Sequence, residues 1–309
     1  MNLQRFLVVA VLGSALAAPA FAGITGSVSP SFGSHNYRGV NADVSLDLGR
    51  HLYVEPMLST YRDDFSSGPY YNAHLRVGYD FGPLSLGVVG GVVPKHQGYS
   101  QGSFGADATF SLSPAGTSRS RRMAGPSSQG NQTFGYGLAG VDIGASAVRV
   151  MHSDDYYASG TGDNSVQPGA LRAKAYKLNE TDLSAFAGAK FLLIELSAQV
   201  TKSVYDKKID VAGVRPAPVL SLTNFGGIES GYPESSYNVK AKISMLPLVH
   251  PYASYTHTNF ELGVPSSNAA EIGGVVGLNM LSVRASVGRY TQKGYSNRNY
   301  VAVGAALNF

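Results

Sequence analysis

The sequence predicts an all-β fold, a transmembrane antiparallel β-barrel of about 14 strands, with a range of about 12 to 16. Apolar and polar residues alternate with a period of two through most of the chain, which is typical of strands and not of helices. Short and long connections follow one another, as at the two ends of a membrane barrel. Only 14% of the 309 residues are charged and 37 are glycine, which fits a wall that faces lipid on one side.

Residues 1–22 have the features of a secretory signal peptide. Arg5 supplies the positive charge, residues 6–18 are apolar, and Ala20-Phe21-Ala22 matches the small-residue cleavage motif. The apolar part is shorter than the roughly 20 residues of a transmembrane helix. We therefore expect cleavage after Ala22 and a single barrel over residues 23–309; the alternative is an N-terminal anchor helix.

Strands are expected wherever the alternation is clean. In residues 38–48, Val40, Ala42 and three further apolar residues lie on one face, while Asn41, Asp43, Ser45 and Asp47 lie on the other. The same pattern predicts strands at 52–61, 71–79, 84–92, 194–201, 237–245, 271–279, 282–288 and 300–309. One face of each strand would meet lipid and the other a wet lumen, which accounts for a mean hydropathy of −0.03.

The connections differ in length. Short turns are expected near Gly49, Phe81, Gly144, Lys190, Pro247 and Met280. The main extracellular loops are expected at 94–132, 153–180 and 206–236, with shorter ones near 34–38, 62–69, 263–269 and 293–298. Residues 104–112 also alternate, but a wall strand there breaks the rhythm of long loops and short turns. We therefore place 104–112 in an extracellular loop, for example as a protruding hairpin.

The C-terminal segment favours a membrane barrel over a soluble periplasmic β-sandwich or lipocalin-like barrel, which would alternate too. Tyr300, Leu307 and Phe309 belong to an alternating strand that ends the sequence on an aromatic residue. This resembles the insertion signal of bacterial outer-membrane barrels. It implies the outer membrane of a Gram-negative bacterium as the location. Its partners would be the barrel-insertion machinery, outer-membrane lipid and lipopolysaccharide.

A family resemblance lies within residues 39–93. The stretch His51-Leu52-Tyr53-Val54-Glu55, the pair Asp63-Asp64 and the segment 75–84 resemble the hairpins of the YfaZ-like outer-membrane proteins. The resemblance implies an outer-membrane barrel and no particular chemistry.

Charged residues on the faces opposite the apolar ones are candidates for the lumen. They are Asp43, Asp47, Glu55, Arg76, Arg149, Lys240, Lys242 and Arg284. Acidic side chains on the early strands, opposite basic side chains on the later strands, would create an electric field across a water-filled channel. This field would select among solutes by charge. This predicts a porin-like passive channel for small polar or charged solutes. The alternative for these residues is a set of ion pairs that only fills the interior.

A second functional hypothesis is a non-conducting surface barrel whose loops bind lipopolysaccharide, a host surface or another envelope protein. Arg119, Arg121 and Arg122 form a basic cluster in a Gly-, Ser- and Pro-rich stretch, and we expect it at the surface. It would contact anionic lipopolysaccharide or simply be solvated.

Enzyme chemistry has weak support. His257, Asn259 and Glu271 are spaced like the site of the outer-membrane lipid A deacylases, which leaves a lipid-modifying enzyme as a third hypothesis, but Asn259 is no nucleophile. His152-Ser153-Asp154-Asp155 resembles one part of an omptin-like protease site without a second Asp-x-His pair. With no Cys, scattered His residues and a net charge of +4, we expect no enzyme activity, cofactor, metal or nucleic-acid partner.

Overall fold

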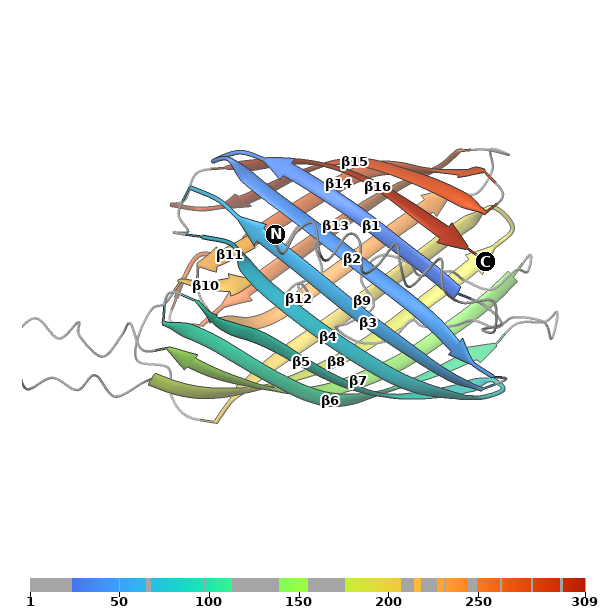
Figure 1. Ribbon diagram of the computed structural model, residues 1–309, viewed down its shortest axis with the longest axis horizontal. Helices are drawn as coiled ribbons and strands as arrows, with labels where there is room; N and C mark the ends of the chain where they lie inside the picture. Colours follow the sequence, from blue (N-terminus) through green and yellow to red (C-terminus); the bar gives the residue numbers. More distant parts are fainter. Residues whose placement is uncertain are drawn as a thin grey trace, which may run out of the picture.

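The computed structural model describes residues 24–49, 51–64, 68–96, 98–112, 139–154, 176–206, 214–217, 227–230, 232–243, 249–261, 263–278, 280–294 and 297–308. Fourteen strands form one closed antiparallel barrel (Figure 1). They are β1 (Ile24–Gly33), β2 (Tyr37–Leu48), β3 (Leu52–Arg62), β4 (Tyr70–Phe81), β5 (Leu84–His96), β6 (Tyr99–Leu112), β7 (Ala139–Asp154), β8 (Tyr176–Phe191), β9 (Ile194–Tyr205), β12 (Pro233–Ile243), β13 (Val249–Phe260), β14 (Ser267–Leu278), β15 (Leu281–Gln292) and β16 (Arg298–Asn308). The predicted fold class and strand number are confirmed.

The barrel closes between its first and last strands. β1 pairs with β16 from Thr25↔Asn308 to Gly33↔Tyr300, and β9 pairs directly with β12. The short strands β10 (Val214–Ala217) and β11 (Gly227–Ser230) pair only with each other. Closure leaves no wall strand with an unpaired edge, as a lipid environment requires.

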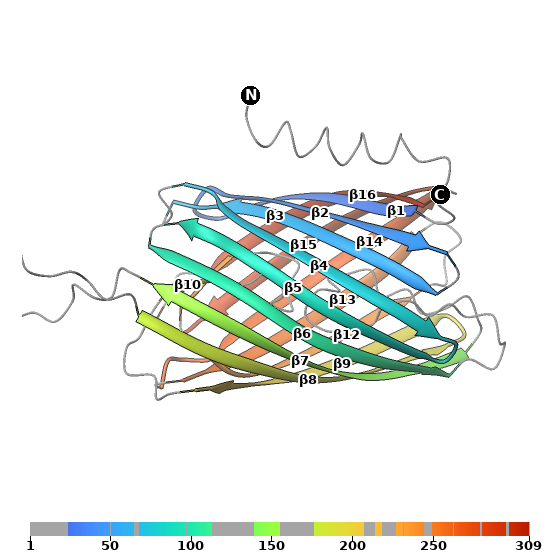
Figure 2. The same cartoon turned by 60° about the horizontal axis from the view of Figure 1, so that its bottom comes forward.

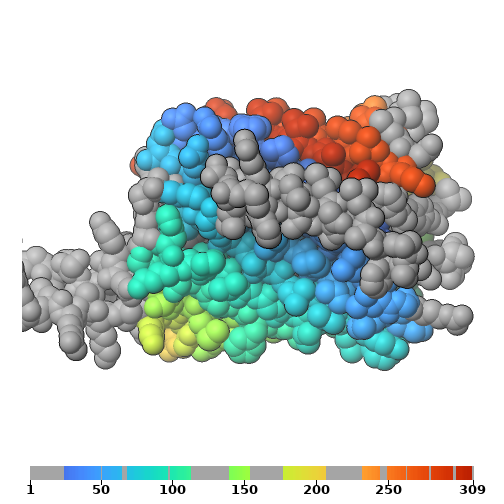
Figure 3. All heavy atoms as spheres, viewed as in Figure 1, coloured from blue at the N-terminus to red at the C-terminus, as the bar shows by residue number. Residues whose placement is uncertain are grey.

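The two faces of the wall follow the period-two pattern. On β2, Asp47 faces inward and is buried, whereas Leu48 faces outward and is exposed. Large apolar side chains are exposed around the whole outer face, among them Leu75, Val88, Phe104, Ile143, Leu183, Ile272 and Val301. Figure 3 shows one side of the barrel, on which the blue to green N-terminal strands lie beside the orange to red C-terminal strands. Because soluble proteins rarely expose such a continuous apolar surface, the wall is built to face lipid.

The two ends of the barrel differ. One end holds the start of β1, the end of β16 and the tight turns at 49–51, 82–83 and 192–193. Gly49 (φ 95°) and Gly82 (φ 79°) adopt the left-handed backbone conformation that glycine permits in such turns. The other end holds the connections 155–175 and 206–232. By the usual asymmetry of membrane barrels, we refer to them as the periplasmic and extracellular ends.

The placement of 104–112 in a loop is wrong. These residues belong to β6, which pairs with β5 and β7 along its length, and Figure 2 shows β4–β8 side by side. A hairpin turn with Gly98 at φ 86° joins β5 to β6 at the extracellular end. Residues 113–138 therefore connect strand ends at the periplasmic end. The predicted extracellular loop 94–132 is wrong because β6 lies within this range and carries the chain back to the periplasmic end.

The turn predicted near Gly144 is also wrong. Gly144 lies within β7 and pairs with Thr109 on β6 and Phe186 on β8. A Cβ atom at this position would collide with the ring of Phe186, so glycine is needed here for packing and not for a turn. The predicted loop 153–180 is shortened, because β7 reaches Asp154 and β8 begins at Tyr176.

Several predictions fall outside the described residues. These are the signal peptide 1–22, the basic cluster Arg119, Arg121 and Arg122, and the terminal Phe309. Within the described part of the chain, no helix has the length and apolarity needed to cross a bilayer.

Candidate functional site: the barrel lumen

A cavity lies against one side of the inner wall. Its lining includes Ser27, Ser29 and Ser31 of β1, Asn41 and Asp43 of β2, and Arg284 of β15, and it holds about 770 Å³ of unfilled space that is partly open to solvent. Ala302, Gly304 and Ala306 of β16 complete this side. Small inward residues on neighbouring strands leave the space unfilled. Hydroxyl, amide and charged groups make the cavity suited to water and polar solutes.

Two local features keep the side chains on this side of the lumen short and polar. The Ser27 hydroxyl donates a hydrogen bond to the Asp43 carboxylate on the neighbouring strand. A Cβ atom at Gly304 would collide with the Ser29 side chain. The serine row of β1 therefore depends on glycine beside it on β16, and together they set the free cross-section at this point.

The neighbouring part of the lumen wall, on β3–β6, is densely filled around Arg76. This arginine is 1% exposed, and its guanidinium donates to Asp107 through Nε (2.8 Å) and Nη2 (2.5 Å). Its Nη1 lies 2.8 Å from Glu55 Oε2. The guanidinium also lies 5.0 Å from the ring centre of Tyr53. A buried cation is thus held by two carboxylates and an aromatic face.

Glycines opposite these large side chains make room for them. A Cβ at Gly87 would come within 2.8 Å of Arg76 Nε. Cβ atoms at Gly78 and Gly91 would collide with the rings of Tyr53 and His74, respectively. Part of the high glycine content therefore serves packing inside the barrel.

A second charged group lies on β9 and β12–β15. Arg284 lies 2.9 Å from Glu271 Oε1, and its Nε donates to the Tyr252 hydroxyl at 2.6 Å. Lys242 Nζ lies 3.2 Å from Glu195 Oε2. Lys240 Nζ lies 5.1 Å from the ring centre of Tyr252. Lys240, Lys242 and Arg284 are partly exposed to the lumen, whereas their partners Glu195, Tyr252 and Glu271 are buried.

Aromatic side chains dominate the inner face near the extracellular end. Tyr37, Tyr61, Tyr70 and Tyr300 form one buried cluster with Met57 and Ala302. The rings of Tyr37 and Tyr300 meet edge to face at 5.0 Å, and those of Tyr61 and Tyr70 stack at 5.5 Å. On β2–β4 the inner face therefore changes along the barrel axis, from tyrosines at the extracellular end to Asp47, Glu55 and Arg76 nearer the periplasmic end.

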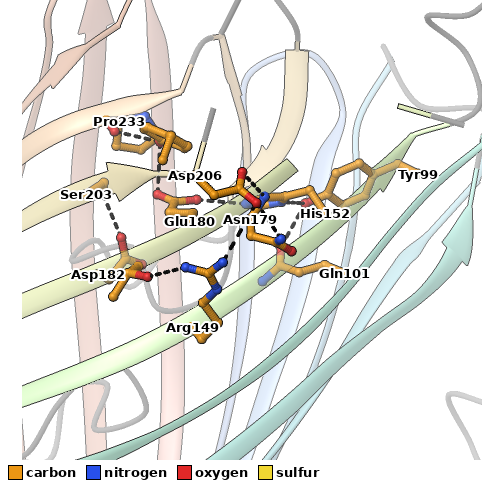
Figure 4. A network of polar contacts seen from close by, with 12 residues as sticks. Tyr99, Gln101, Arg149, His152, Asn179, Glu180, Asp182, Ser203, Asp206 and Pro233 are labelled. Atoms are coloured by element: carbon orange, nitrogen blue, oxygen red, sulfur yellow. Dashed lines mark hydrogen bonds and ion pairs between the residues drawn. The ribbon is translucent and has the colours of Figure 1, made fainter. Parts of the chain in front are cut away.

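A polar network lies at the same end on β6–β9 (Figure 4). His152 Nε2 lies 2.8 Å from Glu180 Oε2, and its Nδ1 lies 2.8 Å from the Tyr99 hydroxyl. The Tyr205 hydroxyl lies 3.0 Å from Glu180 Oε1 and 2.6 Å from the backbone oxygen of Pro233. The network joins strands β6–β9 to the start of β12.

Seven of the eight predicted lumen residues face inward. They are Asp43, Asp47, Glu55, Arg76, Lys240, Lys242 and Arg284. Arg149 does not, because its neighbours Val148 and Val150 are the buried, inward residues of β7. Arg149 instead contacts Thr181 and Asp206 on the outer face. Apolar residues lie on both faces of β7 around Arg149, so the sequence pattern does not show which face points inward.

The acidic and basic groups do not form simple opposing walls. Glu55 and Arg76 pair on adjacent strands, so their charges neutralise each other locally. Asp43 and Arg284, in contrast, both line the cavity from different strands. Asp107, Glu195 and the serine row were missed as lumen residues. Asp107 was detectable, because it lies on the polar face of the alternating segment 104–112.

The residues of the predicted C-terminal insertion signal lie on both faces of the wall. Tyr300 points inward into the tyrosine cluster, while Leu307 follows the outward side of β16. Leu307 therefore fits a lipid-facing role and Tyr300 an internal one.

The residues that resembled a deacylase site are separated by the wall. His257 lies on the outer face, with Nδ1 2.8 Å from Asn268 and Nε2 3.1 Å from Asn259. Glu271 lies inside with Arg284 and Tyr252. A base and its supporting carboxylate on opposite faces cannot act together. Among the described residues, no group of three His, Asp or Glu side chains is placed to hold a metal ion.

The closed wall and polar lumen define a β-barrel of the outer-membrane type. No protein-family model matches the sequence, and no curated protein matches it. The solved structure of the CymD monoaromatic hydrocarbon channel is similar with a TM-score of 0.51 at 9% identity, over 93% of this chain and 88% of CymD. This likeness shows the fold alone.

Two further structures are similar at lower scores. CdiB from Acinetobacter baumannii has a TM-score of 0.49 at 12% identity over 93% of this chain, and this chain spans 60% of CdiB. The NanC porin has a TM-score of 0.44 at 9% identity, over 92% of this chain and all of NanC. Membership in the YfaZ-like family stays a prediction.

Proposed function

We propose that this protein is a passive, porin-like channel in the outer membrane of a Gram-negative bacterium. The observation that carries the proposal is the partly solvent-open cavity lined by serines, Asn41, Asp43 and Arg284 inside a closed, lipid-compatible wall. A barrel of 14 strands is wider than those that side chains fill completely. Export through a signal peptide cleaved after Ala22 and insertion by the barrel machinery are part of the proposal.

The solutes we propose are small and polar or charged. Hydroxyl and amide groups along the cavity replace part of a solute's hydration shell, while Asp43 and Arg284 offer both signs of charge. Lys242 on β12 adds a further partly exposed charged group to the path, as an ion pair with Glu195. Such a lining favours hydrated ions and small hydrophilic molecules over apolar ones.

The first prediction is that the purified, refolded protein conducts ions. In planar bilayers with symmetric potassium chloride, it is expected to give discrete conductance steps, because a wet lumen crosses the membrane. Protein whose mobility on a gel does not shift upon boiling, and which is therefore unfolded, serves as the negative control. A folded barrel that gives no steps and does not swell sugar-loaded liposomes contradicts the channel.

One observation favours the alternative of a non-conducting surface barrel. The Arg76 group and the tyrosine cluster bury large side chains inside the lumen. If these buried side chains close the path, the barrel serves as an anchor. The same recordings separate the two functions.

A further inference from the structure

The outward-facing basic residues of the wall are concentrated at one end. Arg38 and Arg62 lie at the extracellular ends of β2 and β3. Arg149, Lys177, Lys202 and Arg289 also lie in the extracellular parts of their strands. Among the described residues of the wall strands, no outward-pointing Lys or Arg lies near the periplasmic end. Among the described wall strands, the outward-facing cations therefore gather where the outer surface meets the outer leaflet.

Two of these arginines directly oppose each other. Arg38 and Arg62 are cross-strand partners in the β2–β3 ladder, and both are exposed. Directly opposed residues in antiparallel strands have Cβ atoms about 5 Å apart, and like charges at such positions repel. Neither guanidinium group has a hydrogen-bond or ion-pair partner among the residues that the structure describes. By contrast, Arg149 is paired with Asp206 and Lys202 with Glu234.

The surroundings place this pair at the boundary between lipid and water. Phe32 of β1 lies beside Arg38 in register and is 54% exposed. One pair closer to the membrane centre, the outward partners are Val40 and Thr60, followed by Ala42 and Leu58. Below these, the outer positions of β2 and β3 are apolar. Aromatic residues at this level are typical of the interface girdle.

We propose that Arg38 and Arg62 form a binding site for a phosphate group of an anionic lipid in the outer leaflet, namely lipopolysaccharide. Each guanidinium presents a planar set of donors that fits phosphate oxygens in pairs. A phosphate between the two arginines converts their mutual repulsion into attraction, while the acyl chains lie along the apolar strands below. The site is separate from the lumen, so it does not rest on the proposed channel.

The test is a titration of the full-length, detergent-purified barrel with purified lipopolysaccharide, with bound lipid counted by native mass spectrometry. The double variant Arg38→Gln/Arg62→Gln is expected to bind about tenfold or more weakly, since it loses at least one charge-assisted contact. The matched control is Arg149→Gln/Lys202→Gln, which removes two outward cations that are already paired. Its affinity is expected to stay within about twofold of the unmodified barrel.

Four outcomes overturn the proposal: equal binding by both double variants, an equal loss in both, unchanged binding of dephosphorylated lipopolysaccharide, and competition by equimolar inorganic phosphate. The last would mark a site for free phosphate and not for lipid. If the glutamine variant fails to refold, Arg38→Lys/Arg62→Lys takes its place. It keeps the charge without the guanidinium fork and is expected to bind more weakly than the unmodified barrel; unchanged binding overturns the proposal. Conductance is expected to be the same in all these variants.

Discussion

Replacing Arg76 with Met is expected to lower the free energy of unfolding by about 3–5 kcal/mol. Arg76 is 1% exposed and is the common partner of Asp107 and Glu55. Its removal leaves the Asp107 carboxylate, whose side chain is 2% exposed, without the cation that neutralises it. The measurement is urea unfolding of the refolded barrel in lipid vesicles, followed by the loss of heat-modifiable mobility.

A triple variant separates this cause from a simple loss of packing. In Glu55→Gln/Arg76→Met/Asp107→Asn, the carboxylates are replaced by neutral amides of similar shape, so most of the lost stability is expected to return. Arg284→Met is a useful comparison, because the Arg284 side chain is 21% exposed and its loss is expected to cost less. A cost below about 1 kcal/mol for Arg76→Met would contradict a dry, charge-dependent cluster.

The double variant Lys240→Glu/Lys242→Glu is expected to shift ion selectivity strongly toward cations. Both side chains point inward from β12, and the change replaces two positive charges with two negative ones. Charged side chains that line a pore set its selectivity, so the ratio of cation to anion permeability is expected to rise by on the order of fivefold or more. The measurement is the reversal potential in a potassium chloride gradient.

The control has the same change in net charge on the other face of the wall. Lys177 and Lys202 point outward near the extracellular end, and Lys177→Glu/Lys202→Glu is expected to leave the reversal potential almost unchanged. An equal shift in both double variants would mean that overall surface charge, and not the lining of a path, sets the selectivity.

Sequence periodicity predicted the class of fold because each wall strand has one lipid face and one interior face. The strands β2, β3, β4, β9, β12 and β16 were predicted where they occur. The error at 104–112 arose from assuming that long connections occur at one end only. The alternation of Phe104, Ala106, Ala108 and Phe110 was a better guide than connection length. A strand in the wall must alternate between a lipid face and an interior face, whereas a connection at either end can be short or long.

The site was predictable in part. An inward position follows from strand register, so Asp43, Lys240 and Arg284 were identified from alternation alone. Which charges pair is set by neighbouring strands that are far apart in sequence, such as Arg76 with Asp107 across β4, β5 and β6. Arg149 was misassigned because Val148 and Val150 are apolar yet inward. Packing inside a barrel accepts apolar side chains, so polarity does not always mark the lumen.

The most direct test of the channel is chemical modification of a cysteine placed in the cavity. The chain has no Cys, so Ser29→Cys gives a single reactive thiol in the lining. Val28→Cys gives one on the adjacent, outward position, beside Ala42 and Ala305. A bulky cationic thiol reagent added to open channels is expected to lower the conductance of Ser29→Cys by about half or more and to leave Val28→Cys unchanged. Complete labelling of Ser29→Cys, verified by mass spectrometry, without any change in conductance would contradict a path along the serine-lined wall.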